Sequence, residues 1–195
     1  MNSEVQIVEK PEWISWDEIK QCLMDSHAVN RARGINMTHY QWPVEKIKES
    51  LGENGVMFVA LDGKKVVGTA AIGEKNGNAW YARGRYAYMC YAGVLPEYSG
   101  RGIYKALNNK REEIAKELGY HVLLLDTHRK NKQMQEIALK NGYKFVRFFM
   151  ANSKDHYSVV MVKWLNGCPY SSFYCWKKFL FSKINTLLRT RVLRN

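Results

Sequence analysis

The first part of the chain carries apolar residues at helical spacing. One helical face is formed by Trp16, Ile19, Cys22 and Leu23. Ser15 with Glu18 three residues later makes a capping box, so the pattern predicts a helix over about 16–29. A proline in its first turn, Pro43, and a glycine just past its end, Gly52, frame a second predicted helix through Val44, Ile47 and Leu51. The stretch 30–42 has no periodicity and predicts a loop.

From residue 56 the spacing of apolar residues changes to that of strands. Two apolar runs, 56–61 and 65–72, are joined by Asp-Gly, which is a strong hairpin signal. A segment rich in glycine and asparagine predicts a turn over 73–78. Strand residues then follow over 80–94. The central part of the chain is therefore expected to form antiparallel strands.

The remaining pattern alternates helices with strands. The predicted elements are a helix over 103–118, a strand over 121–126, a helix around 134–138, and strands over 143–150 and 157–165. Gly119 and Gly142 stop the two helices. Hairpins flanking a β-α-β unit with a right-handed crossover predict an α/β fold of the mixed α+β kind. Its centre is a twisted mixed sheet flanked by helices.

Composition limits the size of the protein and the kinds of partner it binds. The chain has 195 residues, 46% of them hydrophobic and 13% aromatic, which is enough for one ordinary core. We expect a domain over 1–166 and an extension over 167–195. The net charge is +12, and the extension contributes six basic residues and no acid. Such charge indicates anionic partners: a phosphorylated cofactor, an acidic substrate, nucleic acid or a membrane surface.

Cysteines and histidines do not stand at the spacings of common metal sites. The four cysteines fit neither a zinc site nor a disulfide framework, and the five histidines form no His-x-x-x-His pair. We therefore expect no metal. No stretch resembles a signal peptide or approaches the ~20 apolar residues of a membrane span. The sequence predicts a cytoplasmic protein.

The turn between the predicted strand 80–94 and the next helix has the features of a phosphate cradle. It reads Ser99-Gly100-Arg101-Gly102-Ile103-Tyr104. A helix start offers unpaired N–H groups and a positive dipole end, and glycines let successive N–H groups point at one anion. Arg101 and Lys105 add positive charge. The turn matches neither a Walker loop nor a dinucleotide fingerprint.

Two segments of the chain resemble the motifs of the GNAT superfamily of N-acetyltransferases. The family's acetyl-CoA motif, Arg/Gln-x-x-Gly-x-Gly/Ala after a Val-x-Pro strand end, is resembled by residues 94–103, Val-Leu-Pro-Glu-Tyr-Ser-Gly-Arg-Gly-Ile. The family's Asn-x-x-Ala-x-x-Leu-Tyr-x-Lys-x-Gly-Phe is resembled by residues 131–143, Asn-Lys-Gln-Met-Gln-Glu-Ile-Ala-Leu-Lys-Asn-Gly-Tyr. The resemblance covers about residues 54–165. It implies a GNAT-like fold and acetyl-CoA as co-substrate.

The resemblance also implies which residues hold the cofactor. In this family the pantetheine arm pairs with the strand ahead of the cradle, the cradle takes the pyrophosphate, and an asparagine touches the arm from across the cleft. Carried over to this chain, the cofactor-binding residues are Ala92, Gly93, Val94, Ser99, Gly100, Arg101, Gly102, Ile103, Tyr104, Lys105 and Asn131. Two positions depart from the pattern: Ser99 replaces Arg or Gln, and Tyr104 replaces a small residue.

The catalytic groups are less well defined by the sequence. The usual general acid of the family, the Tyr of Leu-Tyr, is Ala138 here. For the base, Asp126 ends a strand at a position where some members carry a catalytic Glu. Alternation puts His128 on the same face, and its usual pKa of ~6.5 suits neutral pH better than ~3.9 for Asp. The alternative is that Asp126 caps the next loop while His128 is solvated.

The acceptor is expected to be a primary amine of a small molecule. In this family acceptors lie between the first two helices and the last strands, which would place near the opening His27, Asn30, Arg31, Arg33, Asn36 and His39. Basic and amide groups suit an anionic acceptor such as a nucleotide-linked amino sugar, although a solvated loop explains them too. The segment 30–37 together with the carboxyl-terminal extension resembles a bacterial subgroup associated with surface-polysaccharide genes.

The carboxyl-terminal extension predicts a basic amphipathic helix over 172–189. Its apolar positions are Phe173, Trp176, Leu180, Ile184 and Leu187, and its polar positions opposite them are Lys178, Ser182, Asn185 and Arg189. Such a helix suits an anionic membrane interface, which would place the protein at the inner membrane face. The alternatives are packing against its own domain and self-association with a second subunit.

These observations favour an enzyme that acetylates a small-molecule amine by direct transfer. The alternative is a CoA-binding or interaction module with weak or no turnover, which Ala138 motivates. Specific nucleic-acid binding is not expected, because neither a recognition helix nor a stacking motif accompanies the basic extension.

Overall fold

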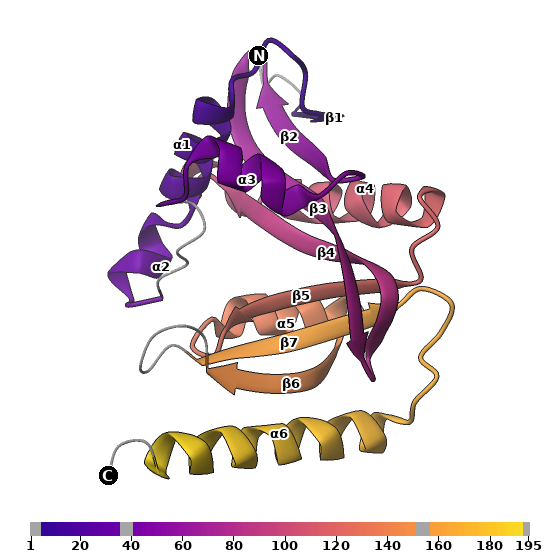
Figure 1. Cartoon of the computed structure of the whole chain (residues 1–195). Coiled ribbons are helices and arrows are strands. Elements are labelled where there is room, and N and C mark those ends of the chain that lie inside the picture. Colours follow the sequence, from indigo (N-terminus) through magenta and orange to yellow (C-terminus); the bar gives the residue numbers. More distant parts are fainter. Residues whose placement is uncertain (1–4, 36–40, 151–156, 193–195) are drawn as a thin grey trace.

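The chain folds around one mixed sheet, shown in Figure 1, a computed structural model that describes residues 5–35, 41–150 and 157–192. The described sheet has seven strands in the order β1-β2-β3-β4-β5-β7-β6. The strands are β1 (Gln6–Glu9), β2 (Val56–Asp62), β3 (Lys65–Ala79), β4 (Ala82–Val94), β5 (Val122–His128), β6 (Lys144–Met150) and β7 (Tyr157–Trp164). All neighbours pair antiparallel except β4 and β5, which run parallel. The predicted mixed α/β fold is confirmed.

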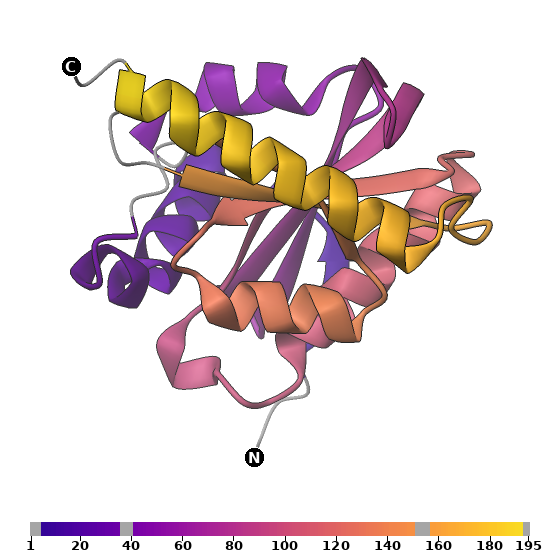
Figure 2. The ribbon, with the colours of Figure 1, turned by 90° about the horizontal axis from the view of Figure 1, so that it is seen from below.

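Helices cover both faces of this sheet. They are α1 (Trp16–Ser26), α2 (Ala28–Ala32), α3 (Val44–Leu51), α4 (Ile103–Glu117), α5 (Lys132–Lys140) and α6 (Ser172–Val192), with a short 3-10 turn at Pro96–Tyr98. Figures 1 and 2 place α3 on one face and both α4 and α5 on the other. Together they enclose the main core, which includes Phe58, Ile72, Leu107 and Leu123. Along the part of the chain described, no helix is long and apolar enough to cross a membrane.

Several local predictions are confirmed, because each depends on short-range chemistry. The Ser15 side chain accepts from the backbone of Glu18, whose carboxylate in turn accepts from the Ser15 backbone, so the capping box is complete. The β2–β3 hairpin turns at the predicted Asp-Gly. Gly119 follows α4 with a φ of 74°, where a side chain would be strained. The predicted first helix, however, divides at His27 into α1 and α2.

The turn predicted over 73–78 is wrong. That segment belongs to β3, which pairs with β4 as far as Ala79 opposite Ala82, so the chain reverses at Trp80 and Tyr81. Tertiary contacts hold this long hairpin: the Trp80 carbonyl accepts from the Tyr170 hydroxyl at 3.0 Å, and Tyr81 is buried against β5 and β7. Pairing and aromatic packing thus outweigh the low strand propensity of Gly and Asn.

Strands β4 and β5 stay together over a short distance only. Their parallel pairing joins Ala87 to Leu123 and Tyr88 to Leu124. Beyond these pairs β4 continues to Val94 and β5 to His128 with no pairing between them, and the two strands diverge. The divergence opens the sheet at its centre, and this opening contains the candidate site.

The carboxyl-terminal helix α6 lies along the edge strand β6, as Figures 1 and 2 show. The Ser182 hydroxyl accepts from the Phe148 N–H at 2.9 Å, and the Thr186 hydroxyl donates to the Phe148 carbonyl at 3.1 Å. These bonds satisfy backbone groups that an edge strand otherwise leaves unpaired. Phe179 and Leu187 pack beside these bonds against Phe148, Tyr157 and Val159. The face of α6 that meets the sheet therefore mixes small polar and large apolar side chains.

Candidate active site

Two cavities meet where β4 and β5 diverge. One, of about 260 Å³, reaches between the strands toward the β3–β4 side. The other, of about 740 Å³, runs past the start of α4 toward α5. The walls common to both are formed by His27, Ala92, Tyr104, Asn131 and Met134. We call them the acceptor-side and cofactor-side cavities. A molecule bound in one is in direct reach of a molecule bound in the other.

Strand β4 carries a bulge at this junction. The pairing with β3 passes from Thr69 opposite Gly93 to Ala71 opposite Cys90, so β4 has one extra residue there. Tyr91, at the bulge, has a φ of 49°. No other non-glycine residue in the described chain has a positive φ. That conformation costs roughly 1–2 kcal/mol for a residue with a side chain, so the surroundings must hold it.

Three side chains hold the bulge by its carbonyl groups. The Arg111 guanidinium donates to the Cys90 carbonyl at 3.3 Å, and the buried Thr69 hydroxyl donates to the Tyr91 carbonyl at 3.0 Å. Nε2 of the His27 ring lies 3.1 Å from the Ala92 carbonyl oxygen. Three consecutive carbonyls are thus bound by groups from α4, β3 and the α1–α2 junction. The bulge bends β4 and sets how its next residues face the cleft.

Arg111 is a charged side chain in an almost fully enclosed place, with 1% of its surface exposed. Its Nη atoms donate to the carbonyls of Ala71 and Cys90 and to the side chain of Asn108, all of them neutral acceptors. Its Nε has no partner within the described residues. It also lines the acceptor-side cavity, where its charge favours anions because no carboxylate within the described chain pairs with it.

The phosphate cradle has the backbone that its glycines predict. Gly100 and Gly102 have φ of 78° and 80°, and open space lies where each would carry a Cβ. Gly102 is the N-cap of α4, and no side chain caps that helix start. The first N–H groups of α4 therefore face the cofactor-side cavity without an intrahelical acceptor, as an anion site requires. The positive φ, rather than crowding, demands glycine here.

Most of the residues predicted to bind the cofactor line one cavity. The cofactor-side cavity is bordered by Ala92, Gly93, Val94, Ser99, Gly100, Gly102, Ile103, Tyr104, Lys105 and Asn131. Arg101 does not line it: its guanidinium lies 4.8 Å from the Tyr98 ring centre and donates to the Glu97 carbonyl. At Gly93 a Cβ would lie 2.1 Å from the Ser26 hydroxyl oxygen, so α1 leaves no room for a side chain there.

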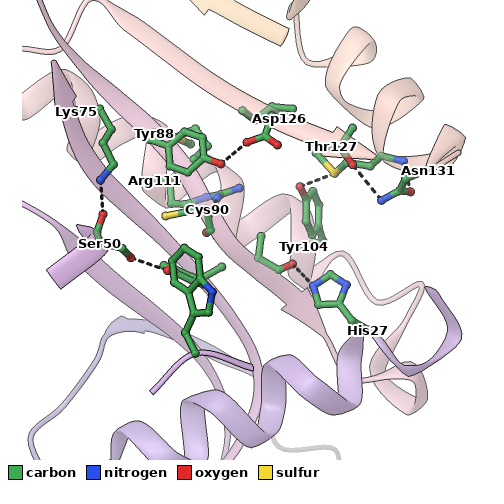
Figure 3. Close-up of a pocket in the computed structure, with 16 residues that line it drawn as sticks. His27, Ser50, Lys75, Tyr88, Cys90, Tyr104, Arg111, Asp126, Thr127 and Asn131 are labelled. Atoms are coloured by element: carbon green, nitrogen blue, oxygen red, sulfur yellow. Dashed lines mark hydrogen bonds between the residues drawn. The ribbon is translucent and has the colours of Figure 1, made fainter. Parts of the chain in front are cut away.

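Asn131 faces β4 from across the cleft. Its Oδ1 accepts from the Met134 N–H at 3.2 Å and so caps α5, while its Nδ2 donates to the Thr127 hydroxyl at 3.2 Å. Figure 3 shows Thr127 and Asn131 together at the end of β5. Tyr104 projects from α4 toward them, and its hydroxyl lies 3.1 Å from the Met134 sulfur. The bulky ring at this position therefore enters the cleft between the cavities.

Asp126 lines the acceptor-side cavity and interacts with Tyr88 of the neighbouring strand. The Tyr88 hydroxyl donates to the Asp126 carboxylate, and the two side chains meet across the gap between β4 and β5 in Figure 3. Burial and the negative charge of Asp126 raise the pKa of Tyr88 well above its usual value. Tyr88 therefore stays protonated and acts as a permanent hydrogen-bond donor to this carboxylate.

The structure places His128 outside both cavities. The ring is buried, with 4% exposure, and its Nδ1 accepts from the Lys130 N–H at 3.2 Å. The His128 carbonyl accepts from the buried Gln135 side chain. Sequence alternation predicted that Asp126 and His128 would act from one face, but the cleft brings only Asp126 to the cavity wall.

His27 is held as a neutral ring. Burial, reinforced by the positive charge of Arg31, lowers its pKa below the usual value, although the hydrogen bond to the Ala92 carbonyl acts in the opposite direction. The Asn30 amide lies 3.3 Å from Nδ1. The group at that distance is the NH2 of Asn30, which can only donate, so Nδ1 accepts and Nε2 carries the proton and donates to the Ala92 carbonyl. His27 thus connects the α1–α2 junction to the bulge.

The residues predicted at the acceptor opening divide into three groups. His27 lines both cavities and Asn30 lines the cofactor-side cavity. Arg31 donates to the Met24 carbonyl, and Arg33 is exposed away from both. Asn36 and His39 lie outside the described residues. The cation that does line the acceptor-side cavity besides Arg111 is Lys75, whose Nζ donates to the Ser50 carbonyl at 2.7 Å.

Sequence reasoning did not identify Tyr88, Tyr91, Lys75 or Arg111. Tyr88 and Tyr91 lie in an apolar strand and carry no local signal. Arg111 does: it follows Leu107 by four residues and so falls on the buried face of α4, where a charged residue is unusual. An arginine on the apolar face of a predicted helix is therefore the sequence signal that could have indicated this cavity.

Burial excludes a reactive thiol at this site. Cys90 lines the acceptor-side cavity, and burial raises its pKa to about 12 despite the nearby charges of Arg111 and Lys75. The thiolate fraction at neutral pH is therefore very small. Within the described chain no group of three or more His, Cys, Asp or Glu residues is arranged to hold a metal ion.

The sequence matches the model of the acetyltransferase (GNAT) family over residues 16–143. None of the curated proteins compared matches it significantly. Among solved structures, a GNAT-family acetyltransferase from Staphylococcus aureus matches with a TM-score of 0.65 and 18% identity, covering 83% of this chain and 99% of that one. An acetyltransferase from Streptococcus agalactiae matches with a TM-score of 0.63 and 18% identity, covering 83% of this chain and 98% of that one. A ribosomal-protein-S18-alanine N-acetyltransferase from Escherichia coli matches with a TM-score of 0.62 and 13% identity, covering 86% of this chain and 98% of that one.

Proposed function

Because the chain belongs to the GNAT family of acetyltransferases, we propose that it moves an acetyl group from acetyl-CoA directly to the primary amine of a small anionic molecule. The observation that carries this proposal is the junction of the two cavities. Their shared walls, among them His27, Ala92 and Tyr104, leave one place where two bound molecules can react. Holding two reactants in such contact supplies much of the rate enhancement of a transfer enzyme.

The chain's own groups fit the cofactor. The left-handed glycine backbone of the cradle and the start of α4 would bind the pyrophosphate, and residues 92–94 of β4 would bind the pantetheine arm opposite Asn131. When bound, acetyl-CoA supplies an activated acyl group. The bulge supports the same assignment, because it directs the β4 backbone toward the cavity junction and an N–H there can polarise a thioester carbonyl.

We assign the role of base to Asp126. A carboxylate at the wall of the acceptor-side cavity attracts the ammonium form of an amine and can accept its proton as nitrogen attacks. Tyr88 orients this carboxylate through its donated hydrogen bond. His128 keeps a structural role in this assignment, since its ring is buried beside the backbone of Lys130 and does not face the cavity.

We assign the role of acid to Tyr104. The family tyrosine is replaced by Ala138, which is buried, so that helix α5 offers no hydroxyl at this position. Tyr104 lines both cavities and brings a hydroxyl to their junction from α4 instead. That hydroxyl can protonate the sulfur of the departing thiolate. Tyr104, which departs from the cradle pattern, would thus supply the hydroxyl that the second motif lacks at Ala138.

Direct transfer is favoured over an enzyme-bound acyl intermediate. Cys90 is the cysteine that lines a cavity in the described chain, and its raised pKa leaves it protonated at neutral pH. We expect Cys90→Ala to keep kcat/KM within about threefold of the unmodified protein. Acetylation of Cys90 in a trapped intermediate, or loss of turnover in a folded Cys90→Ala protein, would contradict direct transfer.

The charges of the acceptor-side cavity support an acceptor with both an amine and an anionic group. Lys75 and Arg111 bring two positive charges and Asp126 one negative charge to its wall. An amine placed near Asp126 leaves the cations available for a carboxylate or phosphate. A nucleotide-linked amino sugar has both groups, with its sugar in the cavity and its nucleotide toward solvent.

The test is release of free CoA thiol in the presence of a panel of amines. The panel contains nucleotide-linked amino sugars, amino acids, neutral and cationic amines, and peptides with free amino termini. We expect turnover with anionic amines and a kcat/KM at least tenfold lower for neutral analogues, because the cavity cations then lack a partner. Preference for cationic amines or peptides would overturn the anionic acceptor while keeping acyl transfer.

Ala138 also favours a second function, a CoA-binding module without turnover. One pair of measurements distinguishes the enzyme from the CoA-binding module. Calorimetry that shows acetyl-CoA binding, together with no thiol release across the whole panel, would favour the module and reject the enzyme.

A further inference from the structure

The outward face of α6 is apolar and lies on no other described part of the chain. Its exposed side chains and their exposed fractions are Phe173 (70%), Trp176 (56%), Leu180 (36%), Phe181 (64%), Ile184 (47%) and Leu188 (55%). Single exposed apolar side chains are common, but six of them along about four turns of one helix are not. We call these six residues the apolar row.

The apolar row is exposed because the opposite face of α6 serves the sheet. Cys175 and Thr190 are buried there, with 2% and 8% exposure. Ser182 and Thr186 bond the backbone of β6 at Phe148. A helix that only needed to cover its own domain would turn its large side chains inward. Here Ser182 and Thr186, together with Phe179 and Leu187, fix α6 on the sheet, and the six side chains of the apolar row remain exposed.

Basic grooves run along both sides of the apolar row. One groove, of about 430 Å³, lies between α6 and the β3–β4 turn, with Arg147, Lys178 and Arg189 in its walls. The other, of about 580 Å³, lies toward α5, and its cations are Arg129, Lys130, Lys132 and Lys183, with Glu136 as its acid. None of these seven cations forms an ion pair within the described residues.

We propose that α6 docks the protein on an anionic lipid bilayer, with the apolar row entering the interface and the cations of both grooves binding lipid phosphates. Apolar centre and basic flanks are the arrangement of helices that lie in a bilayer surface. Trp176 supplies an aromatic ring of the kind enriched at the interface, and Phe173 and Phe181 belong to the apolar residues typical of such helices. Figure 2 shows α6 crossing the near side of the molecule, so a flat surface can meet its length.

Charge decides between a bilayer and a second copy of the chain. The sequence of α6 contains Lys177, Lys178, Lys183, Arg189 and Arg191 and no acidic residue. Two such helices in contact would bring these like charges of both copies together around an apolar contact and leave them without partners. An anionic bilayer instead supplies a phosphate for each cation, and each cation near such a surface adds to the attraction.

The test is sedimentation of the full chain with vesicles. One set is phosphatidylcholine, and the other is an equal mixture of phosphatidylcholine and phosphatidylglycerol. We expect binding to the mixed vesicles, at least tenfold weaker binding to phosphatidylcholine alone, and loss of binding as salt is raised. Phe181→Ser with Ile184→Ser should weaken binding to mixed vesicles at least tenfold, and Lys178→Glu with Arg189→Glu should abolish the preference for them.

Matched controls change similar residues at the other end of the sheet. Trp13 is 58% exposed and precedes α1, and Lys64 is exposed at the β2–β3 turn. Trp13→Ser and Lys64→Glu should leave vesicle binding unchanged. Point variants are used because removing α6 would also uncover the edge of β6.

Three results would overturn the proposal. The first is absence of binding to mixed vesicles at low salt. The second is equal binding by the apolar-row variant and the unmodified protein. The third is a concentration-dependent dimer in analytical ultracentrifugation that Phe181→Ser with Ile184→Ser abolishes, without vesicle binding. That third result would assign the apolar row to self-association.

Discussion

The two cavities at the centre of the sheet differ in how much of their proposed chemistry comes from the backbone and how much from side chains. The cofactor-side cavity includes three backbone segments in its wall: the glycine turn, the start of α4 and the bulged end of β4. The acceptor-side cavity is bordered by side chains, among them Tyr88, Asp126 and Arg111 from β4, β5 and α4. A site made of backbone binds what all family members share. A site made of side chains can change its ligand without changing the fold.

The difference also predicts how each cavity responds to substitution. A side-chain site loses its chemistry when one group is removed, while its shape stays. A backbone site tolerates loss of a side chain but not a residue that its φ angles forbid. Variants at the two cavities should therefore separate turnover from cofactor binding.

The largest effect is expected at the base. Asp126→Asn keeps the size of the side chain and an oxygen that can accept from Tyr88, but it removes the charge and the proton acceptor. We expect kcat to fall about 10²–10³-fold with the dissociation constant for acetyl-CoA unchanged. Thiol-release kinetics and calorimetry measure the two quantities. Asp25→Asn, an exposed carboxylate on α1, should change neither. A matching loss of cofactor affinity in Asp126→Asn would mean that the two cavities are not separable.

The next effect concerns the backbone of the cradle. Gly102→Val forces a β-branched residue to a φ of 80° and should lower acetyl-CoA affinity at least tenfold. Gly119→Val is the matched control, because Gly119 has a φ of 74° and equally open surroundings but lies at the far end of α4. Both variants should lose similar stability in thermal unfolding, and only the first should lose affinity. Equal affinity for both would remove the cradle from cofactor binding.

A smaller effect is expected from the proposed acid at the junction. Tyr104→Phe should lower kcat about 10–100-fold while acetyl-CoA binding stays within about twofold. Tyr143→Phe is the control, because the Tyr143 hydroxyl is buried and has no partner within the described residues. If both variants turn over at the rate of the unmodified protein, the thiolate leaves without help from Tyr104.

The smallest effect is on stability. The pKa of His27 is lowered in the folded protein, so the unfolded chain takes up the proton first when the pH falls below about 6.5. The stabilising contribution of neutral His27 is therefore complete above that pH and is lost on acidification. His27→Gln should reduce the loss of thermal stability between about pH 7.5 and about pH 5.5. An unchanged loss would show that His27 does not titrate on unfolding in this range.

The contrast between the cavities also explains what the sequence could predict. The cradle was located because a glycine turn before a helix is a local pattern, and Asn131 because its segment resembles a family motif. Most of the order of elements follows from periodicity together with caps and turn residues. The bulge at Tyr91 was not found, because it depends on Thr69, Arg111 and His27, which meet only in the folded chain. No pattern within β4 contains that information.

Two other differences have equally physical causes. The short strand β1 was missed because Gln-Ile-Val-Glu is too brief to show a period. Of the five predicted apolar positions of α6, four are exposed and Leu187 packs on the sheet. A helical period indicates that a helix has an apolar face, but not which side of the helix packs on the domain. That side is known only from the contacts of Ser182, Thr186 and Phe179 with β6. Whether Asp126 or Tyr104 acts in catalysis remains a prediction for kinetics to test.

The clamped bulge of β4 has a consequence for the thermodynamics of ligand binding. Tyr91 holds a left-handed backbone inside a strand, and side chains from three elements fix the carbonyls on and beside it. The chain loses this conformational freedom once, when it folds, so a ligand meets a surface that needs no further ordering. Amide hydrogens of β4 near the bulge should therefore exchange slowly even without ligand. Ligand binding should add little to their protection.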